Sequence, residues 1–231
     1  MIKIRNPFKG FTKFEWALWI SSLAAITATH FAVGGGDTLS LVASLIGVTS
    51  LIYAARGDVI APCLFIAFAI IYAVISYFSG YYGEMIIYLG MQLPISCVSL
   101  VSWFKNRGEG ARVKISALTW KKLLFALGLA AIITVPFYFL LEYFNTLNLI
   151  PSTVSVATSV TALCLMALRI PQFALAFILN DIVMIVLWSL TLSTSLEHIS
   201  LVVCFSIFLI NDGYTFINWL RKARSSRGQV S

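Results

Sequence analysis

Charged residues are scarce in this sequence. Only 11% of its 231 residues are Asp, Glu, Lys or Arg, and 60% are hydrophobic, whereas soluble globular domains carry about 25% charged residues. This shortage of charge excludes an ordinary water-soluble fold. The sequence therefore predicts an integral membrane protein.

Cysteine and histidine are also few. The four cysteines all lie inside apolar segments and are spaced too widely for the paired motifs of metal or redox sites. They are Cys63, Cys97, Cys164 and Cys204. We expect packed thiols, no metal site and no cofactor, and we expect the protein not to be an enzyme. An intramembrane enzyme acting on a lipid would need acids or histidines near one surface with bases for phosphate, and this arrangement is missing.

No Lys or Arg lies within a long apolar segment. All 16 of them can be assigned to one face of the membrane, and the other face carries only acidic residues. These acidic residues are Asp37, Glu84, Glu142 and Glu197. Because membrane proteins retain basic residues on the cytoplasmic side, both termini are predicted to be cytoplasmic. This topology accounts for the net charge of +7, so no nucleic-acid partner is expected.

Long apolar segments make up most of the chain. A helix of about 20 residues crosses the hydrocarbon core of a bilayer, and eight segments reach or approach that length. They cover residues 16–33, 38–55, 59–78, 83–104, 123–141, 152–168, 174–192 and 199–220. The predicted fold is an all-α membrane protein with about eight transmembrane helices.

Two parts of the chain look like copies of one unit. LIYAAR ends at Arg56 and CLMALR ends at Arg169, and the third helix of each unit ends on a tryptophan, Trp103 or Trp219. A single helix between two three-helix units leaves both in the same orientation, as in some transporters. We predict an N-terminal tail and helix over 1–37, a first three-helix bundle over 38–104, a cytoplasmic loop and linker helix over 105–151, a second bundle over 152–220 and a basic tail over 221–231.

Two polar pairs interrupt the last two apolar segments. Asn180 and Asp181 lie in LAFILNDIVMIVLW, and Asn211 and Asp212 lie in VVCFSIFLINDGYTFINW. A charged side chain at the bilayer centre costs roughly 3 kcal/mol, so such residues indicate a functional site. As an alternative, the two aspartates hydrogen-bond each other's helices in protonated form and are structural.

Helical spacing places further polar and aromatic side chains on common faces. Tyr88, Gln92, Ser96, Ser99 and Trp103 form one such face, with Pro94 available to kink the helix. Amides, carboxyls and aromatic rings together suit a flat heterocycle that carries a sugar. The absence of intramembrane bases favours a neutral or cationic solute. The candidate substrate-binding residues are Gln92, Asn180, Asp181, Trp188, Asn211, Asp212, Tyr88, Tyr72 and Tyr214. Small Ser and Thr residues are interpreted as interhelical hydrogen-bonding groups.

The sequence resembles the PnuC family of vitamin transporters, in particular its nicotinamide riboside members. The similarity rests on YYGEMIIYLGMQLPISCVSLVSWFKN, ALRIPQFALAFILNDIVMIVLW and VVCFSIFLINDGYTFINW, in that order. The positions carried over are Gln92, Asn180, Asp181, Trp188, Asn211 and Asp212. Many members have an acidic-Asn-Trp run where this chain has Pro171, Gln172 and Phe173, which leaves room for a related substrate.

The resemblance implies a fold similar to that of SWEET sugar transporters, with the site between two bundles in a bacterial inner membrane. It implies facilitated diffusion of nicotinamide riboside, trapping by intracellular phosphorylation, and hence a functional link to a cytoplasmic riboside kinase. It also makes a homotrimer plausible. The alternatives are a transporter of thiamine or a deoxynucleoside, a proton-coupled symporter that uses Asp181 or Asp212, and, more distantly, an intramembrane enzyme.

Overall fold

A computed structural model describes residues 8, 10–32, 34, 38–78, 82–108, 112–146, 148–191 and 199–228. Its regular elements are all helices: α1 (Lys13–Ala32), α2 (Thr38–Arg56), α3 (Ile60–Phe78), α4 (Tyr82–Ile87), η1 (Tyr88–Gln92), α5 (Leu93–Lys105), α6 (Trp120–Tyr143), α7 (Leu149–Ala167), α8 (Phe173–Thr191) and α9 (Ile199–Gly228). Within these described ranges the only β pairing is two isolated bridges. The predicted all-α class is confirmed.

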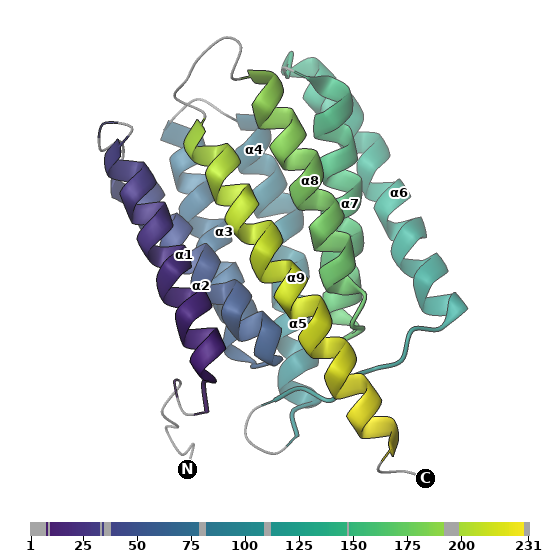
Figure 1. Cartoon of the computed structure of the whole chain (residues 1–231). Helices are drawn as coiled ribbons and strands as arrows, with labels where there is room; N and C mark the ends of the chain where they lie inside the picture. The colour runs from purple at the N-terminus through teal and green to yellow at the C-terminus, as the bar shows by residue number, and fades with distance from the viewer. Residues whose placement is uncertain are drawn as a thin grey trace.

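Eight helical segments run between the two ends of the molecule, if α4, η1 and α5 are taken as one interrupted helix (Figure 1). In the part of the chain that the structure describes, six helical segments are long and apolar enough to cross a membrane. They are Thr38–Arg56, Met85–Lys105, Trp120–Tyr143, Leu149–Ala167, Phe173–Leu190 and Val202–Ser225. The part of α3 that meets the apolarity requirement is shorter, Ile60–Ile75. The protein is a multi-pass membrane protein.

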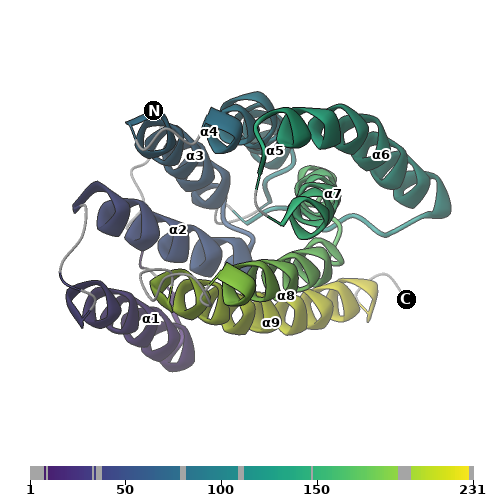
Figure 2. The ribbon, with the colours of Figure 1, turned by 90° about the horizontal axis from the view of Figure 1, so that it is seen from above.

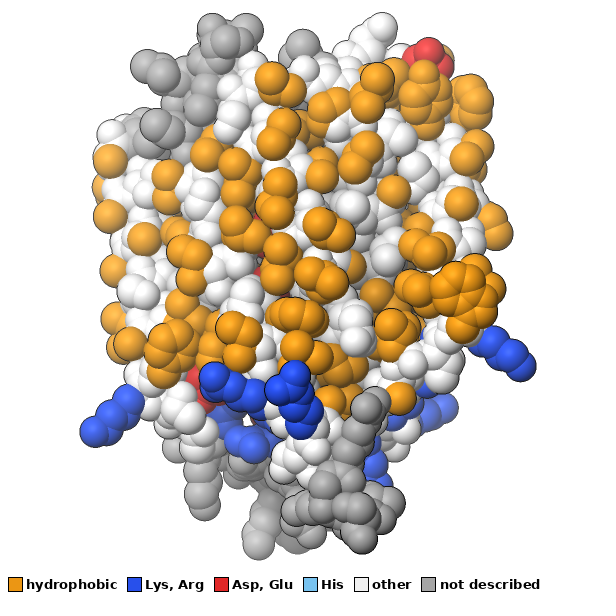
Figure 3. Space-filling view, turned by 45° about the vertical axis from the view of Figure 1, so that its right-hand side comes forward, with side chains coloured by type: hydrophobic (Ala, Val, Ile, Leu, Met, Phe, Trp, Pro, Cys, Tyr) orange, Lys and Arg blue, Asp and Glu red, His pale blue; other side chains and the backbone are white. Residues whose placement is uncertain are grey.

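Basic side chains gather at one end of the molecule, which we call the basic end (Figure 3). The start of α1 and the end of α9 both lie there (Figure 1). At the opposite end, Glu142 is exposed at the end of α6. Asp37 and Glu197 lie outside the described residues, as does the side chain of Glu84.

Six helical segments form a closed ring when the molecule is viewed along its long axis (Figure 2). Going round the ring, α2 contacts α3, α3 contacts α5, α5 contacts α7, α7 contacts α8, α8 contacts α9, and α9 returns to α2. We call α2, α3 and α4–α5 the first helix group and α7, α8 and α9 the second. Outside the ring, α1 packs on α2 and α9, and α6 packs on α7.

The first helix of each group ends in the same kind of turn. Gly57 follows α2 with φ 67° and Arg169 follows α7 with φ 61°. The N–H of Gly57 donates to Ala54 O at 2.9 Å, and that of Arg169 donates to Met166 O at 2.9 Å. This is the left-handed termination common at helix C-termini. The sequence comparison had aligned Arg56 with Arg169, and this register is wrong by one residue because the left-handed positions are Gly57 and Arg169.

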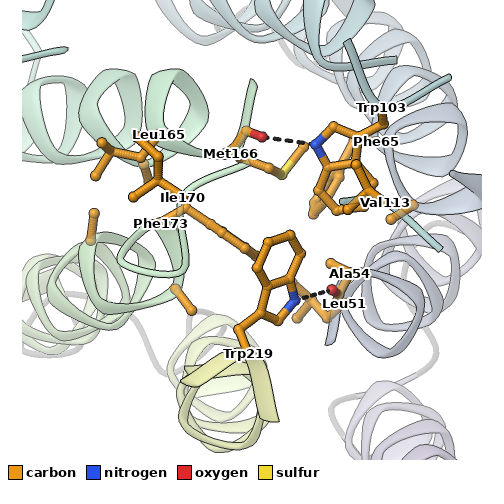
Figure 4. Packing of buried hydrophobic residues seen from close by; sticks show 14 of the residues in the cluster. Leu51, Ala54, Phe65, Trp103, Val113, Leu165, Met166, Ile170, Phe173 and Trp219 are labelled. Atoms are coloured by element: carbon orange, nitrogen blue, oxygen red, sulfur yellow. Dashed lines mark hydrogen bonds between the residues drawn. The ribbon is translucent and has the colours of Figure 1, made fainter. Parts of the chain in front are cut away.

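Tryptophans from the opposite group complete these two helix ends (Figure 4). Trp219 Nε1 on α9 donates to Ala54 O at 2.8 Å, and Trp103 Nε1 on α5 donates to Met166 O at 2.8 Å. A helix leaves its last carbonyls without intrahelical donors, and lipid supplies none. These two carbonyls, which also accept the N–H groups of Gly57 and Arg169, thus gain a second donor from the opposite group. We call the two tryptophan bonds the crossed caps.

A neighbouring donor reinforces each crossed cap. Asn218 Nδ2 donates to Ala55 O at 2.8 Å, and Ser102 Oγ donates to Ala167 O at 2.6 Å. Each of these donors immediately precedes its tryptophan in the sequence. The two ends are thus built alike.

The segment between α5 and α6 ties the same two turns together. The N–H of Val113 donates to Gly57 O at 2.8 Å, and that of Ser116 donates to Arg169 O at 3.0 Å. We call residues 112–116 the strap. From the sequence, only a cytoplasmic loop was predicted here.

The side chain of Arg169 keeps its charge at this position. Burial lowers the pKa of Arg169 from its usual value, but a guanidinium remains protonated at neutral pH.

Aromatic side chains fill the ring just inside the crossed caps. Phe65 on α3 stacks on Phe177 on α8 with centroids 6.3 Å apart, so side chains from opposite sides of the ring meet. Phe173 contacts Trp219 at 4.9 Å, and Trp103 contacts Trp219 at 5.6 Å. We call these five residues the aromatic layer. It closes the interior toward the basic end.

We expect Trp219→Phe to lower the Tm of the purified protein, because Ala54 O loses its indole donor from the opposite group and keeps only the N–H of Gly57. A hydrogen bond of this kind contributes about 0.5–1.5 kcal/mol net. Thermal unfolding in detergent measures the change. Trp120→Phe is the matched control, since Trp120 is 70% exposed, and equal Tm values for the two variants would contradict the role of the caps.

Candidate functional site

The candidate site lies in the ring on the far side of the aromatic layer from the basic end. On α8, Phe173, Phe177 and Asn180 follow at i, i+4 and i+7, so Asn180 continues the face that begins in the layer. On α5, Ser99 and Ser96 continue the face of Trp103, and both are fully buried. Polar groups thus replace aromatic ones along the same two faces.

The helix that carries Gln92 is interrupted by a π turn. Tyr88–Gln92 is π-helical, and the N–H of Leu93 donates to Tyr88 O, five residues back. Pro94 follows directly and has no N–H to continue an α-helical ladder. Single π turns are frequent at functional sites. The interruption that the sequence led us to expect near Pro94 is therefore a π turn. The half-buried Gln92 is the last residue of this turn.

Tyr72 and Tyr88 form the aromatic part of the site. Their ring centroids lie 4.3 Å apart, between α3 and η1. Phe68 contacts both rings, at 5.6 Å from Tyr72 and 5.9 Å from Tyr88. Gly47 on α2 lies behind Phe68, where an added Cβ would approach Phe68 Cε2 at 3.3 Å. The structure therefore brings together two of the predicted tyrosines.

Asn180 is held by α7. Its Nδ2 donates to Ser155 O at 3.0 Å and to Thr158 Oγ1 at 3.0 Å. The amide is 8% exposed. Small Ser and Thr residues were interpreted from the sequence as interhelical hydrogen-bonding groups, and the hydroxyl of Thr158 forms such a bond with Asn180. Ser155 takes part through its backbone carbonyl. Trp188, two turns further along α8, is half-buried.

Asp181 and Asp212 meet at the contact of α8 and α9. Both are buried, at 3% and 2% exposed, and their carboxyl groups lie within hydrogen-bonding reach of each other. An ionised carboxylate only accepts hydrogen bonds, so such a bond needs a proton on one partner. This arrangement fits the structural alternative of the sequence analysis. One oxygen of each carboxyl group has no partner among the described residues.

Asn211 and Tyr214 turn away from the other candidates, toward α1. Asn211 Nδ2 donates to Ser22 Oγ at 3.1 Å, and Tyr214 Oη donates to Glu15 Oε1 at 3.2 Å. Glu15 is also the N3 residue of a capping box whose N-cap is Thr12, at the start of α1. The structure does not bring these two predicted residues to Asn180. On α9 they lie one and two residues from Asp212, which meets α8, and each step along a helix rotates the side chain by about 100°. Their side chains therefore bond α1 instead.

The sequence analysis missed the aromatic layer. Phe173 and Phe177 precede Asn180 on one face, and this spacing was the signal in the sequence that could have revealed the layer.

Among the described residues, no group of three or more His, Cys, Asp or Glu side chains is placed to hold a metal ion. The four cysteines are free thiols, and Cys63 and Cys97 are exposed at the helix surface rather than packed.

Comparison with known proteins places the chain in a family. The profile of the family described as nicotinamide mononucleotide transporter matches residues 37–221. The chain belongs to this family. The match starts after α1, so the family core comprises the six-helix ring together with α6.

Two curated relatives match nearly the full length of the chain. The chain is 28% identical to the nicotinamide riboside transporter PnuC of Neisseria mucosa, over 97% of this chain and 88% of the relative. It is 22% identical to the nicotinamide riboside transporter PnuC of Haemophilus influenzae, over 95% of each chain.

A solved structure shares the fold. The chain is similar to the crystal structure of the vitamin B3 transporter PnuC, with a TM-score of 0.76 and 26% identity over 93% of each chain. The resemblance stated from the sequence motifs is therefore confirmed at the level of family and fold.

We expect Gly47→Ala to lower the Tm, because the new methyl group would lie 3.3 Å from both Phe68 and Phe208. Overpacking of this kind typically costs about 1–3 kcal/mol. Gly128→Ala is the matched control, since a Cβ there meets nothing within 4 Å, and its Tm should stay the same or rise. A Tm for Gly47→Ala as high as that of the control would show that the rings at this point yield freely.

Proposed function

We propose that the protein carries nicotinamide riboside across the membrane by facilitated diffusion. The observation that supports this most is membership of a family whose curated relatives are named for that riboside. The candidate site adds buried amide and carboxyl groups and half-buried tyrosines of chemistry that suits it. Family and fold both belong to transporters. The protein is therefore proposed to act without chemical conversion of its substrate.

The chemistry of the site matches that of the riboside. A pyridinium ring carries a positive charge, which aromatic faces attract, and Tyr72, Tyr88 and Trp188 are the candidate rings. The carboxyl pair of Asp181 and Asp212 provides the acidic groups. Ribose hydroxyls and the carboxamide require hydrogen-bonding partners, and we assign Gln92 and Asn180 to them.

The riboside is a better match than its phosphorylated form. A buried phosphate needs Arg, Lys or a cluster of N–H donors. The described Lys and Arg side chains lie at the basic end, where Arg56 ends α2 and Arg169 follows α7, beyond the aromatic layer. The interior offers a dianion no countercharge, although the family description names the mononucleotide.

We propose that transport proceeds by rocking of two bundles, residues 38–104 and 152–220. The basic end is assigned to the cytoplasm by its charge, so both termini are cytoplasmic, and the aromatic layer is the cytoplasmic closure. Opening toward the cytoplasm then requires the crossed caps to break. Phosphorylation by a cytoplasmic riboside kinase would trap the product, and a homotrimer is proposed on family resemblance alone.

Calorimetric binding to the detergent-purified protein tests substrate and site together. We expect nicotinamide riboside to bind, and its mononucleotide, nicotinamide and thiamine to bind weakly. Gln92→Ala and Asn180→Ala should each weaken riboside binding about tenfold or more, through lost hydrogen bonds. Asn106→Ala removes an amide at the basic end and should leave the affinity unchanged. Binding of thiamine alone would show that thiamine, rather than the riboside, is the substrate. If none of the four compounds releases or absorbs heat on mixing, the proposal is wrong.

A proton-coupled symporter is the second candidate, and the paired carboxyl groups of Asp181 and Asp212 favour it. Facilitated diffusion predicts that riboside uptake into vesicles is unchanged by a proton ionophore and by a pH gradient, because no proton moves with the substrate. Uptake is measured with labelled riboside in reconstituted vesicles. Accumulation against a riboside gradient that collapses with the ionophore would support the symporter instead.

A further inference from the structure

The orientation of the Asn180 amide is fixed by its partners on α7. Its two hydrogen bonds run to Ser155 O and Thr158 Oγ1, both at 3.0 Å. A backbone carbonyl only accepts hydrogen bonds, so the group that faces Ser155 O must be the NH₂ group. The carbonyl oxygen Oδ1 therefore points away from α7.

Thr158 is itself held as an acceptor. Its hydroxyl donates to Val154 O and Ser155 O of its own helix, each at 3.0 Å. A hydroxyl has a single hydrogen, so its lone pairs remain for Asn180. Both hydrogens of the Nδ2 amino group are thus used on α7.

The remaining polar atom of Asn180, Oδ1, has no hydrogen-bond partner among the described residues. Asn180 lies one turn beyond Phe177, whose ring meets Phe65 across the interior. Oδ1 is also not among the side-chain atoms that are completely enclosed without a partner, so part of this oxygen is open to a ligand. The group that completes Asn180 must be a hydrogen-bond donor.

We propose that Asn180 recognises a hydrogen-bond donor of the substrate, a hydroxyl or an amide N–H, and that Thr158 is the positioning residue that fixes this polarity. The inference rests on the proposed function, because it takes the substrate to be a riboside. Ligands that present only an acceptor at this point are rejected, since two acceptors face each other.

Riboside analogues that each lack one donor test this assignment. Fluorine in place of the 2′, 3′ or 5′ hydroxyl, and a carboxylate in place of the carboxamide, all remove a donor. In the wild-type protein we expect one of these analogues to lose affinity about tenfold or more through the contact with Asn180. That loss should vanish in Asn180→Ala, which has no acceptor to satisfy.

Thr158→Val separates positioning from mere packing. The change removes the hydroxyl at nearly constant shape, so the amide is free to turn and present its NH₂ group. We expect the penalty of the same analogue to shrink several-fold in Thr158→Val and to remain in Thr158→Ser, which keeps the hydroxyl. Thr161→Val is the matched control, because Thr161 bonds only Ala157 O, and it should keep the wild-type penalty.

The outcomes distinguish the two proposals. Riboside binding with the same analogue penalties in wild type, Asn180→Ala and Thr158→Val overturns the role of Asn180 and Thr158 but keeps the proposed function. If Thr161→Val reduces the analogue penalty as much as Thr158→Val does, the positioning role of Thr158 is also overturned. Absence of riboside binding by the wild-type protein overturns both. The comparison of wild type with Asn180→Ala still decides the matter if Thr158→Val does not fold.

Discussion

The crossed caps are the interaction on which the rest of the structure depends. In lipid, every backbone carbonyl needs a partner within the protein, and the last carbonyls of a helix have none in their own helix. Trp219 supplies the donor for α2, and Trp103 supplies it for α7. Each of these carbonyls also accepts the N–H of the turn that follows its own helix, so the tryptophan is a second donor, and it comes from the opposite helix group. The strap reinforces this dependence through Val113 and Ser116.

This closure defines the chemistry of the interior. The aromatic layer lies between the basic end and the part of the ring that carries Asn180, Gln92 and the carboxyl pair. The described Lys and Arg side chains lie at the basic end. Under the proposed function, a cationic solute avoids the electrostatic cost that a phosphate would meet beyond the layer.

Sequence patterns predicted the candidate site residues one helix at a time. Polar residues within apolar runs singled out Asn180 and Asp181, and helical spacing placed Tyr88 and Gln92 on one face of their helix. The contact of Tyr88 with Tyr72, on another helix, is visible only in the structure. The same reasoning failed for Asn211 and Tyr214, since it could not show that α1 packs against that side of α9. It also misaligned Arg56 with Arg169, because the match followed residue type rather than the backbone, where Gly57 is the true counterpart.

The sequence by itself determined the membrane environment, the helical class and the sidedness of charge. These properties follow from composition and from the order of apolar and basic segments, because lipid leaves few other structures possible. Only the tertiary structure decided which face of each helix meets which neighbour. A rotation of about 100° between successive residues separates Asn180, bonded to α7, from Asp181, beside α9, and no local pattern in the sequence records that rotation.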